Sequence, residues 1–273
     1  MTTAAPHTPP ALRDELVALA ERLALEAAAL LVDGLRRDRV DVATKTSGTD
    51  MVTEMDHASE ALILEGVRSV RPDDGFLGEE GSTVAGTSGV RWVIDPIDGT
   101  TNYLYSHPGF SVSIAVEVEG VAVVGVVVDP LHDDVFTAVR GGGARCNGEP
   151  IRASAKADLP TALVGTGFAY EGDRRRRQAE VLGRIIGDIR DVRRMGAASV
   201  DLCSVACGRL DAYYERGLAP WDLAAGVLVA VEAGARVGAL DGGPPSDAFV
   251  LAAAPAIFDP LRRLLSAAGA GEA

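Results

Sequence analysis

Residues 92 to 139 contain four segments with the composition of β-strands, and this series narrows the possible folds more than any other part of the chain. Short turns such as Glu119-Gly120 join the later segments, which predicts that they pair antiparallel. The four strands are predicted at Trp92–Asp95, Ser111–Val118, Val121–Asp129 and Asp134–Val139. The residue before a proline stays extended and a proline cannot donate to a ladder, so the first strand is predicted to end at Asp95-Pro96.

Helical periodicity surrounds this series. Leu, Ala and Val recur at helical spacing over 11–34, and a second amphipathic helix follows Asp56. In the second half strands alternate with helices: strands at 162–165, 191–194, 211–214, 236–239 and near Phe249, and helices after Asp173, over 198–207, at Trp221 and at Pro260. The pattern predicts a layered α/β (α+β) sandwich with mixed sheets.

The expected organisation is one compact domain over residues 11–266. It would have an α+β lobe over 11–150 and an α/β lobe over 151–266, with the functional site between them. The ends, residues 1–10 and 267–273, are small or polar and are predicted to be disordered tails.

The motif that carries chemistry is Trp92-Val-Ile-Asp95-Pro96-Ile97-Asp98-Gly99-Thr100-Thr-Asn-Tyr103. Asp95 and Asp98 can converge at the end of the strand with the carbonyl of Ile97 between them, and Mg²⁺ prefers such hard oxygen ligands. Gly99 and Thr100 would follow with backbone N–H groups for phosphate oxygens. An ordinary turn is the alternative explanation of these residues.

Three further acidic segments accompany the motif: Gly78-Glu79-Glu80-Gly81, Pro220-Trp221-Asp222 and Asp50-Met-Val-Thr53-Glu-Met-Asp56. Each alone fits a solvated loop or a helix cap. Together, Glu79, Asp95, Asp98 and Asp222 supply enough carboxylates for two Mg²⁺ ions roughly 3.5–4 Å apart, the spacing of two-metal hydrolases.

These segments resemble the inositol monophosphatase family of Mg²⁺-dependent, lithium-sensitive sugar phosphatases. The resemblance covers nearly the whole chain. It rests on the Trp92–Tyr103 motif, on Trp221-Asp222-Leu-Ala-Ala-Gly with the later Glu232-Ala-Gly-Ala, on Gly78-Glu79-Glu80, and on the spacing of Lys45, Asp50, Thr53 and Asp56.

The resemblance implies a role for each residue. Glu79, Asp95 and the carbonyl of Ile97 would hold a first Mg²⁺ that activates a water molecule. Asp95 would bridge to a second Mg²⁺ completed by Asp98 and Asp222, and a weaker third ion would lie near Glu79, with Lys45 as a neighbouring cation. Thr100, oriented by Asp56, would position the attacking water, and the amides of Gly99 and Thr100 would hold the phosphate.

The implied substrate is a small phosphorylated polyol or sugar. Glu215, Asp98 and the backbone around Gly196 and Ala197 would contact its hydroxyl groups, which favours inositol monophosphate. Histidinol phosphate is the alternative, and fructose 1,6-bisphosphate and nucleotide phosphates are used by relatives on the same scaffold. A regulatory, partner-binding protein is the alternative outside enzymes, because some bacterial members associate with the transcription machinery. The family also implies a homodimer.

Whole-chain properties exclude several classes. A net charge of −13 argues against nucleic-acid binding, and no apolar run reaches the ~18 residues of a membrane helix. Without a signal peptide's pattern, a cytoplasmic location is expected. The four histidines lie in no catalytic or metal-binding pattern.

The cysteines and an arginine run are two further features of the sequence. The three cysteines lack a disulfide pattern, and Cys203 and Cys207 are interpreted as buried small apolar residues. The run Arg174–Arg177 is interpreted as a solvated helix start, with a position at the mouth of the active site as the alternative.

Overall fold

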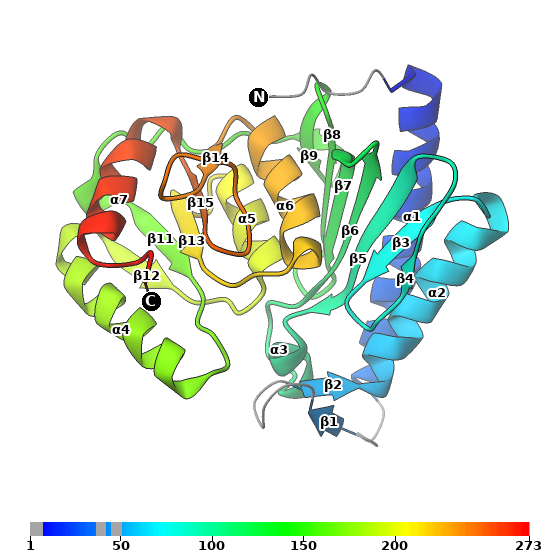
Figure 1. Cartoon of the computed structure of the whole chain (residues 1–273), viewed down its shortest axis with the longest axis horizontal. Coiled ribbons are helices and arrows are strands. Elements are labelled where there is room, and N and C mark those ends of the chain that lie inside the picture. Colours follow the sequence, from blue (N-terminus) through cyan, green and yellow to red (C-terminus); the bar gives the residue numbers. More distant parts are fainter. Residues whose placement is uncertain (1–7, 37–41, 45–50, 273) are drawn as a thin grey trace.

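A computed structural model describes residues 8–36, 42–44 and 51–272. Its elements form five layers, helices–sheet–helices–sheet–helices (Figure 1). An eight-stranded sheet has the order β10 (Glu149–Pro150), β9 (Gly143–Cys146), β8 (Asp134–Val139), β7 (Val121–Asp129), β6 (Ser111–Val118), β5 (Val90–Asp98), β3 (Gly75–Gly78), β4 (Thr83–Val84). A five-stranded sheet has the order β12 (Asp191–Arg193), β11 (Leu163–Thr166), β13 (Ala212–Glu215), β15 (Val250–Ala253), β14 (Arg236–Gly238). A short pair, β1 (Val42–Thr44) and β2 (Met51–Thr53), stands apart.

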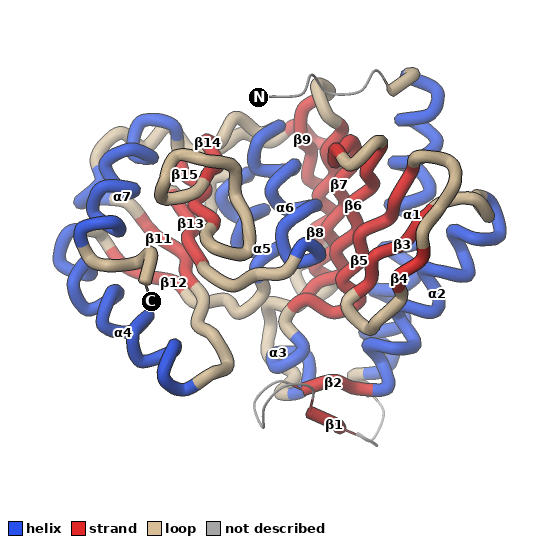
Figure 2. Tube along the Cα trace, in the orientation of Figure 1, coloured by secondary structure: helices blue, strands red, loops and turns tan. Residues whose placement is uncertain are grey.

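The helices are arranged around these two sheets (Figure 2). Helices α1 (Pro10–Gly34) and α2 (Glu54–Val70) cover the outer face of the large sheet. Helices α5 (Ala198–Ala206) and α6 (Pro220–Glu232) lie between the sheets, and α4 (Gly172–Ile185) and α7 (Pro255–Ala267) cover the outer face of the small sheet. Short elements are α3 (Thr100–Leu104) and the 3₁₀ turns Leu159–Thr161 and Ile186–Asp188. None of the described helices is both long and apolar enough to cross a membrane.

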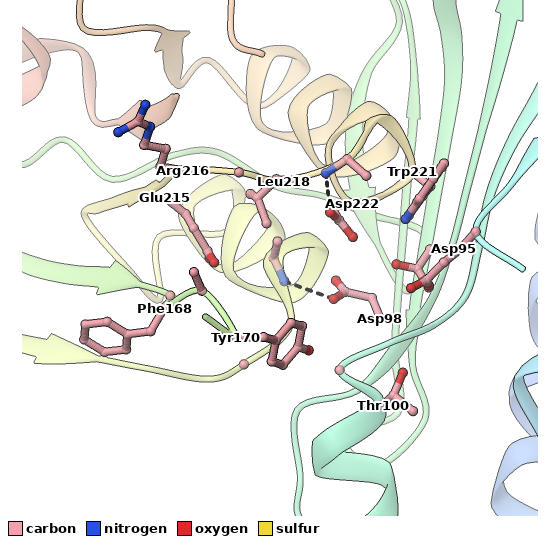
Figure 3. Close-up of a pocket in the computed structure, with 18 of the residues that line it drawn as sticks. Asp95, Asp98, Thr100, Phe168, Tyr170, Glu215, Arg216, Leu218, Trp221 and Asp222 are labelled. Carbon is pink, nitrogen blue, oxygen red and sulfur yellow. Dashed lines mark hydrogen bonds between the residues drawn. The ribbon is translucent and has the colours of Figure 1, made fainter. Parts of the chain in front are cut away.

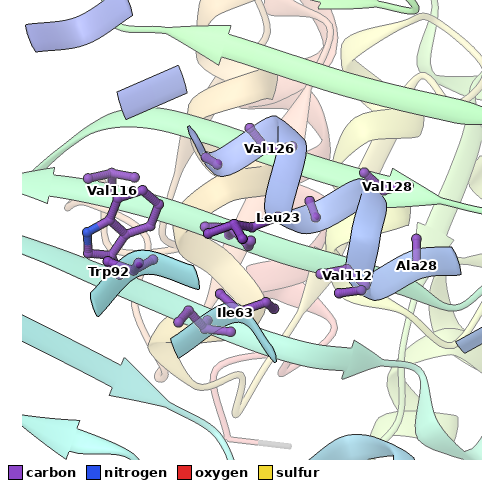
Figure 4. Packing of buried hydrophobic residues seen from close by; sticks show 14 of the residues in the cluster. Leu23, Ala28, Ile63, Trp92, Val112, Val116, Val126 and Val128 are labelled. Carbon is purple, nitrogen blue, oxygen red and sulfur yellow. The ribbon is translucent and has the colours of Figure 1, made fainter. Parts of the chain in front are cut away.

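Alternation along the strands explains why the large sheet is covered on both faces. Successive side chains of a strand point to opposite faces, so Trp92 and Ile94 enter the core under α1 and α2 whereas Val93 enters the core around α5 and α6. Figure 4 shows Trp92 with Leu23 of α1 and Ile63 of α2 in the first of these cores. Both faces of the sheet are therefore apolar, and the polar groups of β5 concentrate at the end of the strand.

The antiparallel series predicted from residues 111 to 139 is confirmed, because β6, β7 and β8 have the predicted bounds and pair antiparallel. The fold class is also confirmed, since both sheets are mixed: β3 pairs parallel with β5, and β11 pairs parallel with β12 and β13. Sequence patterns missed the short strands β4, β9 and β10 of the large sheet, the pair β1 and β2, and the five-residue helix α3, whereas both edge strands of the small sheet, β12 and β14, were predicted.

Two sequence predictions are wrong. Strand β5 does not end at Asp95-Pro96 but continues to Asp98. The predicted tails are partly ordered: α1 begins at Pro10, and the described residues after 267 include Ala268 and Ala270, which pack into the core under α7. Their alanine-rich composition suggested disorder, but small apolar side chains can fill a core as well as large ones.

Candidate active site

A cavity of about 450 Å³ lies where the end of β5 meets the second half of the chain. Its walls come from β5, α3, the end of β13 and the first turns of α4, α5 and α6 (Figure 3). The predicted site residues that line it are Glu79, Asp95, Ile97, Asp98, Gly99, Thr100, Gly196, Glu215 and Asp222. Asp56 lies behind Thr100 and does not line the cavity, and Ala197 is buried at the start of α5 without being part of the lining.

A bulge near the end of β5 explains how two aspartates three residues apart reach the same cavity. In a regular strand, such residues point to opposite faces. Here Asp95 pairs with Ser113 and Asp98 with Ser111, so β5 carries one extra residue at this point. This bulge accommodates Pro96, which has no N–H to donate, and turns both carboxylates toward the cavity.

Hydrogen bonds fix the bulge in place. The carbonyl of Pro96 accepts a bond from Ser59 Oγ of α2 at 3.0 Å, and the N–H of Ile97 donates to Asp95 Oδ1 at 3.1 Å. Gly99 follows with φ of 91°, a left-handed conformation that favours glycine. A Cβ at this position would lie 2.8 Å from the carbonyl oxygen of Gly109, so the tight turn into α3 needs a glycine for space as well.

Glu79 reaches the same place because of strand pairing. Strand β3 runs parallel to β5 with Gly78 opposite Ile94, so the residues that follow these two positions, Glu79 and Asp95, emerge at the same end of the sheet. The N–H of Glu79 donates to the carbonyl of Ile94 at 3.2 Å, which anchors the chain at this point.

Asp98 is held by the start of α5. The N–H groups of Ala198 and Ser199 donate to its two carboxylate oxygens at 3.2 and 2.7 Å, and Ser199 Oγ donates at 2.5 Å. Helix N-termini have free N–H donors that favour an anion. Asp98 therefore joins β5 of the first half to α5 of the second half.

Asp222 comes from the first turn of α6, where Pro220 occupies the first helical position. Its Oδ2 accepts a bond from the N–H of Ala219 at 2.6 Å, so the capping role predicted from sequence is present. One carboxylate oxygen each of Asp95, Asp98 and Asp222 lies within 4.8 Å of the others. A capping bond uses one lone pair and leaves the rest of the carboxylate to face the cavity.

This group of acids fits a divalent cation. Asp95 and Asp98 are buried, Asp222 is half-buried, and in the described part of the chain no lysine or arginine forms an ion pair with any of them. Buried charges of one sign are costly without an opposite charge. All the donors are hard oxygens, which suits Mg²⁺ rather than a thiophilic metal.

Burial and mutual repulsion shift the pKa of each acid. Burial, followed by the charge of Glu79, raises the pKa of Asp95 well above its usual value, and burial and the charge of Asp98 do the same for Asp222. Burial raises the pKa of Asp98 to about 6, although its bonds from Ser199 act in the opposite direction. A bound cation would reverse these shifts because it favours the ionised acids.

A pH dependence of stability follows. An acid with a raised folded-state pKa stabilises the protein fully below its unfolded pKa of about 4, and this contribution is lost as the pH rises through the folded value, about 6 for Asp98. We therefore expect the melting temperature of the metal-free protein to fall between about pH 4 and 7. Saturating Mg²⁺ should raise it more at pH 8 than at pH 5. Differential scanning calorimetry with EDTA or Mg²⁺ measures both effects, and an equal Mg²⁺ shift at the two pH values would contradict the assignment.

Thr100 and Asp56 are brought together as the sequence resemblance implied. Thr100 Oγ1 lies 3.2 Å from Asp56 Oδ1 and 3.0 Å from the carbonyl oxygen of Ile97, so its single proton can go to either acceptor. In both cases the lone pairs of Oγ1 remain to accept a hydrogen bond. Thr100 lines the cavity, and Asp56, which is fully buried in α2, lies behind it.

Glu215 lies on the wall across the cavity from β5. The hydroxyl of Tyr213, two residues earlier on β13, donates to Glu215 Oε2. Burial raises the pKa of Glu215 to about 7, opposed by this bond and by the charges of Arg194 and Arg174. A carboxyl group in a cavity whose pKa is near neutrality can accept a hydrogen bond from a ligand hydroxyl or donate one to it.

Sequence reasoning missed Ser199, which fixes Asp98, and Arg194 and Tyr170, which line the cavity. Of these three, only Ser199, at a helix start after the predicted Gly196-Ala197 segment, offered a signal. Arg174 also lines the cavity, the position that the alternative interpretation of the arginine run gave it, and so does Trp221. Asp201 is also buried nearby, and burial followed by the charge of Glu215 raises its pKa.

Other predicted residues are not part of the described cavity. Lys45 and Asp50 lie outside the described residues, and for Thr53 only its place at the end of β2 is described. Cys203 is buried as predicted, and Cys146 and Cys207 pack half-buried against the same core; none is in a disulfide. Burial raises the pKa of all three thiols, which makes them poor nucleophiles.

Comparison with solved structures agrees with this fold. The extragenic suppressor protein suhB from Bartonella henselae has a TM-score of 0.88 and 34% sequence identity, and the match covers 92% of this chain and 98% of that one. The layered fold of the chain is that of proteins with the inositol monophosphatase fold, among them the Thermotoga maritima IMPase TM1415, with a TM-score of 0.86.

The chain belongs to the inositol monophosphatase family, whose sequence model matches residues 12–268. The inositol-1-monophosphatase of Mycobacterium bovis is 43% identical over 268 residues, which cover 90% of this chain and 91% of that protein. The Nus factor SuhB of Pasteurella multocida is 43% identical over 244 residues, covering 88% and 91%. The family identifies the protein as a phosphatase of this superfamily.

Proposed function

We propose that this protein is a Mg²⁺-dependent phosphomonoesterase that hydrolyses inositol monophosphate to inositol and phosphate. The observation that carries the proposal is the convergence of Asp95, Asp98 and Asp222 in one cavity, where no lysine or arginine of the described residues forms an ion pair with any of the three. Two Mg²⁺ ions, held by Glu79, Asp95, the Ile97 carbonyl, Asp98 and Asp222, would supply Lewis acidity toward water and the leaving oxygen. A third, weaker ion near Glu79 belongs to the same proposal.

The residues of the chain then position the reactants. Thr100 Oγ1 accepts a hydrogen bond from the attacking water while its own proton is directed to Asp56, so Thr100 and Asp56 together take up the proton that the water loses. The oxygen of the water attacks phosphorus in line, and the bond from phosphorus to the ester oxygen breaks with its electron pair on that oxygen. The polyol leaves as an alkoxide and takes up a proton from solvent water, and Asp56 later returns its proton to solvent. The amides of Gly99 and Thr100 hold the phosphate oxygens.

The substrate is recognised across the cavity. Glu215 accepts a hydrogen bond from a ring hydroxyl, and Asp98 and the backbone at Gly196 and Ala197 contact other hydroxyls. A buried polar group penalises substrates that lack its partner, and the bond from Tyr213 keeps the Glu215 carboxylate in place. The 43% identity to a protein named inositol-1-monophosphatase supports this choice of substrate.

A panel of phosphate esters tests the proposal. Phosphate release from inositol 1-phosphate, histidinol phosphate, fructose 1,6-bisphosphate and adenosine 3′,5′-bisphosphate would be measured with Mg²⁺ and with EDTA. We expect Mg²⁺-dependent release that is fastest with inositol 1-phosphate. Equal phosphate release in EDTA would contradict the metal mechanism. Faster release from another ester of the panel would change only the proposed substrate.

A second candidate function is binding to transcription proteins. Relatives named Nus factor SuhB are 43% identical in Pasteurella multocida, so that role is compatible with this fold. A pull-down of purified Nus factors and RNA polymerase with the metal-free protein would detect it. Enzyme and partner roles are separable, because Asp95→Asn should remove turnover and leave the outer surface unchanged.

A further inference from the structure

The four consecutive arginines at the start of α4 do not share one environment. Arg175 donates to the carbonyl of Ala169 at 2.9 Å, Arg176 pairs with Asp173, and both are exposed, as is Arg177. Arg174 alone of the four lines the active-site cavity, and it is half-buried there. Arg174 therefore lies in the active-site cavity, whereas the other three arginines lie on the exposed surface of the helix.

Packing on a glycine holds Arg174 in this position. A Cβ on Gly217 would overlap both terminal nitrogens of the guanidinium, so the side chain lies directly against the backbone of this residue. Gly217 has φ of 84° and donates its N–H to the carbonyl of Asp247 at 2.7 Å. It belongs to the loop between Glu215 and the start of α6, and the guanidinium thus lies beside the strand end that carries Glu215.

Within the described residues, no carboxylate forms an ion pair with Arg174, although the positive charge of Arg174 acts to lower the pKa of Glu215. The titratable groups of the cavity divide into two sets. Glu79, Asp95, Asp98 and Asp222 gather at one side. Arg174 lies on the wall built by the second half of the chain, together with Tyr170, Glu171, Arg194, Glu215 and Arg216. Guanidinium groups bind carboxylates and phosphates through two parallel hydrogen bonds.

We propose that Arg174 forms a second anion subsite in the active-site cavity, which adds affinity for phosphate esters whose alcohol part carries a further carboxylate or phosphate. The proposal rests on the phosphomonoesterase function proposed above and adds such esters to the substrates that the site accepts. The reacting phosphate lies at the carboxylate side, and the second anion lies at the α4 side. The alcohol part of inositol 1-phosphate would contact this wall through hydroxyl groups alone, whereas that of a doubly anionic ester of similar size would also contact Arg174.

Arg174 has a simpler alternative role, which the experiment must separate from the proposed one. Its charge could act only on Glu215, keeping that carboxylate ionised for a ligand hydroxyl. In that case loss of Arg174 would lower kcat/KM equally for esters of neutral and of anionic alcohols. A subsite for an anion predicts instead that kcat/KM falls mainly for the esters that carry a second charge.

Glucose 1-phosphate and glucuronic acid 1-phosphate form a matched pair, because they differ only by a carboxylate in place of the hydroxymethyl group on C5, which is separated by the ring oxygen from the C1 atom that carries the phosphate. We expect the wild-type enzyme with Mg²⁺ to favour the glucuronic ester in kcat/KM by about tenfold, the size expected for a charge-assisted bond. Arg174→Gln should reduce this ratio to near one, mainly through KM. Arg174→Lys should restore part of it, and rising salt should lower the wild-type ratio.

Arg177→Gln is the matched control, since it removes an exposed neighbour from the same run and should leave the ratio unchanged. A wild-type ratio near one, or an Arg174→Gln variant that loses activity equally on both esters, overturns the subsite and leaves the phosphatase function in place. No release from either ester or from inositol 1-phosphate in the presence of Mg²⁺ overturns both proposals. Glucose 1,6-bisphosphate, compared with glucose 1-phosphate, shows whether a phosphate serves as well as a carboxylate.

Discussion

Replacing Asp95 by asparagine is expected to lower kcat on the order of 10³-fold or more, because changes to groups that only support metal ligands already cost 10–100-fold. Asp95 is 1% exposed, and it lies among Glu79, Asp98 and Asp222, so asparagine removes the charge at the centre of the group. Phosphate release from inositol 1-phosphate over a range of Mg²⁺ concentrations measures the effect. Added Mg²⁺ should not restore full turnover.

The same variant should fold, and its stability provides a second test. Removing one of several repelling acids should raise the melting temperature of the metal-free protein at pH 8 and shrink the increase caused by Mg²⁺. Asp129→Asn is the matched control, because Asp129 is equally buried at the end of β7 but lies outside the cavity, bound to His132. Activity of Asp95→Asn within tenfold of wild type would contradict the assignment of Asp95 as a Mg²⁺ ligand.

Trp92→Ala should reduce the free energy of unfolding by about 4 kcal/mol, the usual cost of removing a large buried aromatic side chain. Trp92 is fully buried between β5 and the helices α1 and α2. Its Nε1 donates to Asp74 Oδ2 at 2.9 Å, and Asp74 is also bound by Arg71 and Ser88. The indole thus fixes the strand that carries Asp95.

Urea denaturation followed by circular dichroism measures this loss. Trp92→Phe should lose less because it keeps an aromatic ring in the core, and Val70→Ala, at a side chain 54% exposed, should change stability by less than about 0.5 kcal/mol. If Trp92→Ala were as stable as Val70→Ala, the core under α1 would not depend on this residue.

Much of the fold could be predicted because its strands are long and locally encoded. The strands at 111–118, 121–129 and 134–139 have strong β-propensity and short connections, and all three were confirmed with their predicted bounds. The convergence of Glu79, Asp95, Asp98 and Asp222 could also be predicted, since their motifs resemble one family. Their part in catalysis stays a prediction.

What the sequence did not reveal depends on contacts between distant segments. Pro96 predicts a strand end, but pairing with β6 continues the strand through a bulge, which no local pattern encodes. Ser199 acts because α5 begins opposite Asp98, one hundred residues away in the chain. Arg174 could not be separated from its three neighbours until Gly217 and the cavity were placed beside it.

The two walls of the cavity differ in how much change each can tolerate. The wall formed by β5 is part of the packed sheet, so a substitution there alters catalysis and stability together. The opposite wall includes Tyr170 and Glu171, which are exposed, and the first turn of α4, which is largely exposed as well. New specificities can therefore be selected on that wall at little cost in folding, while the hydrolytic chemistry is inherited unchanged.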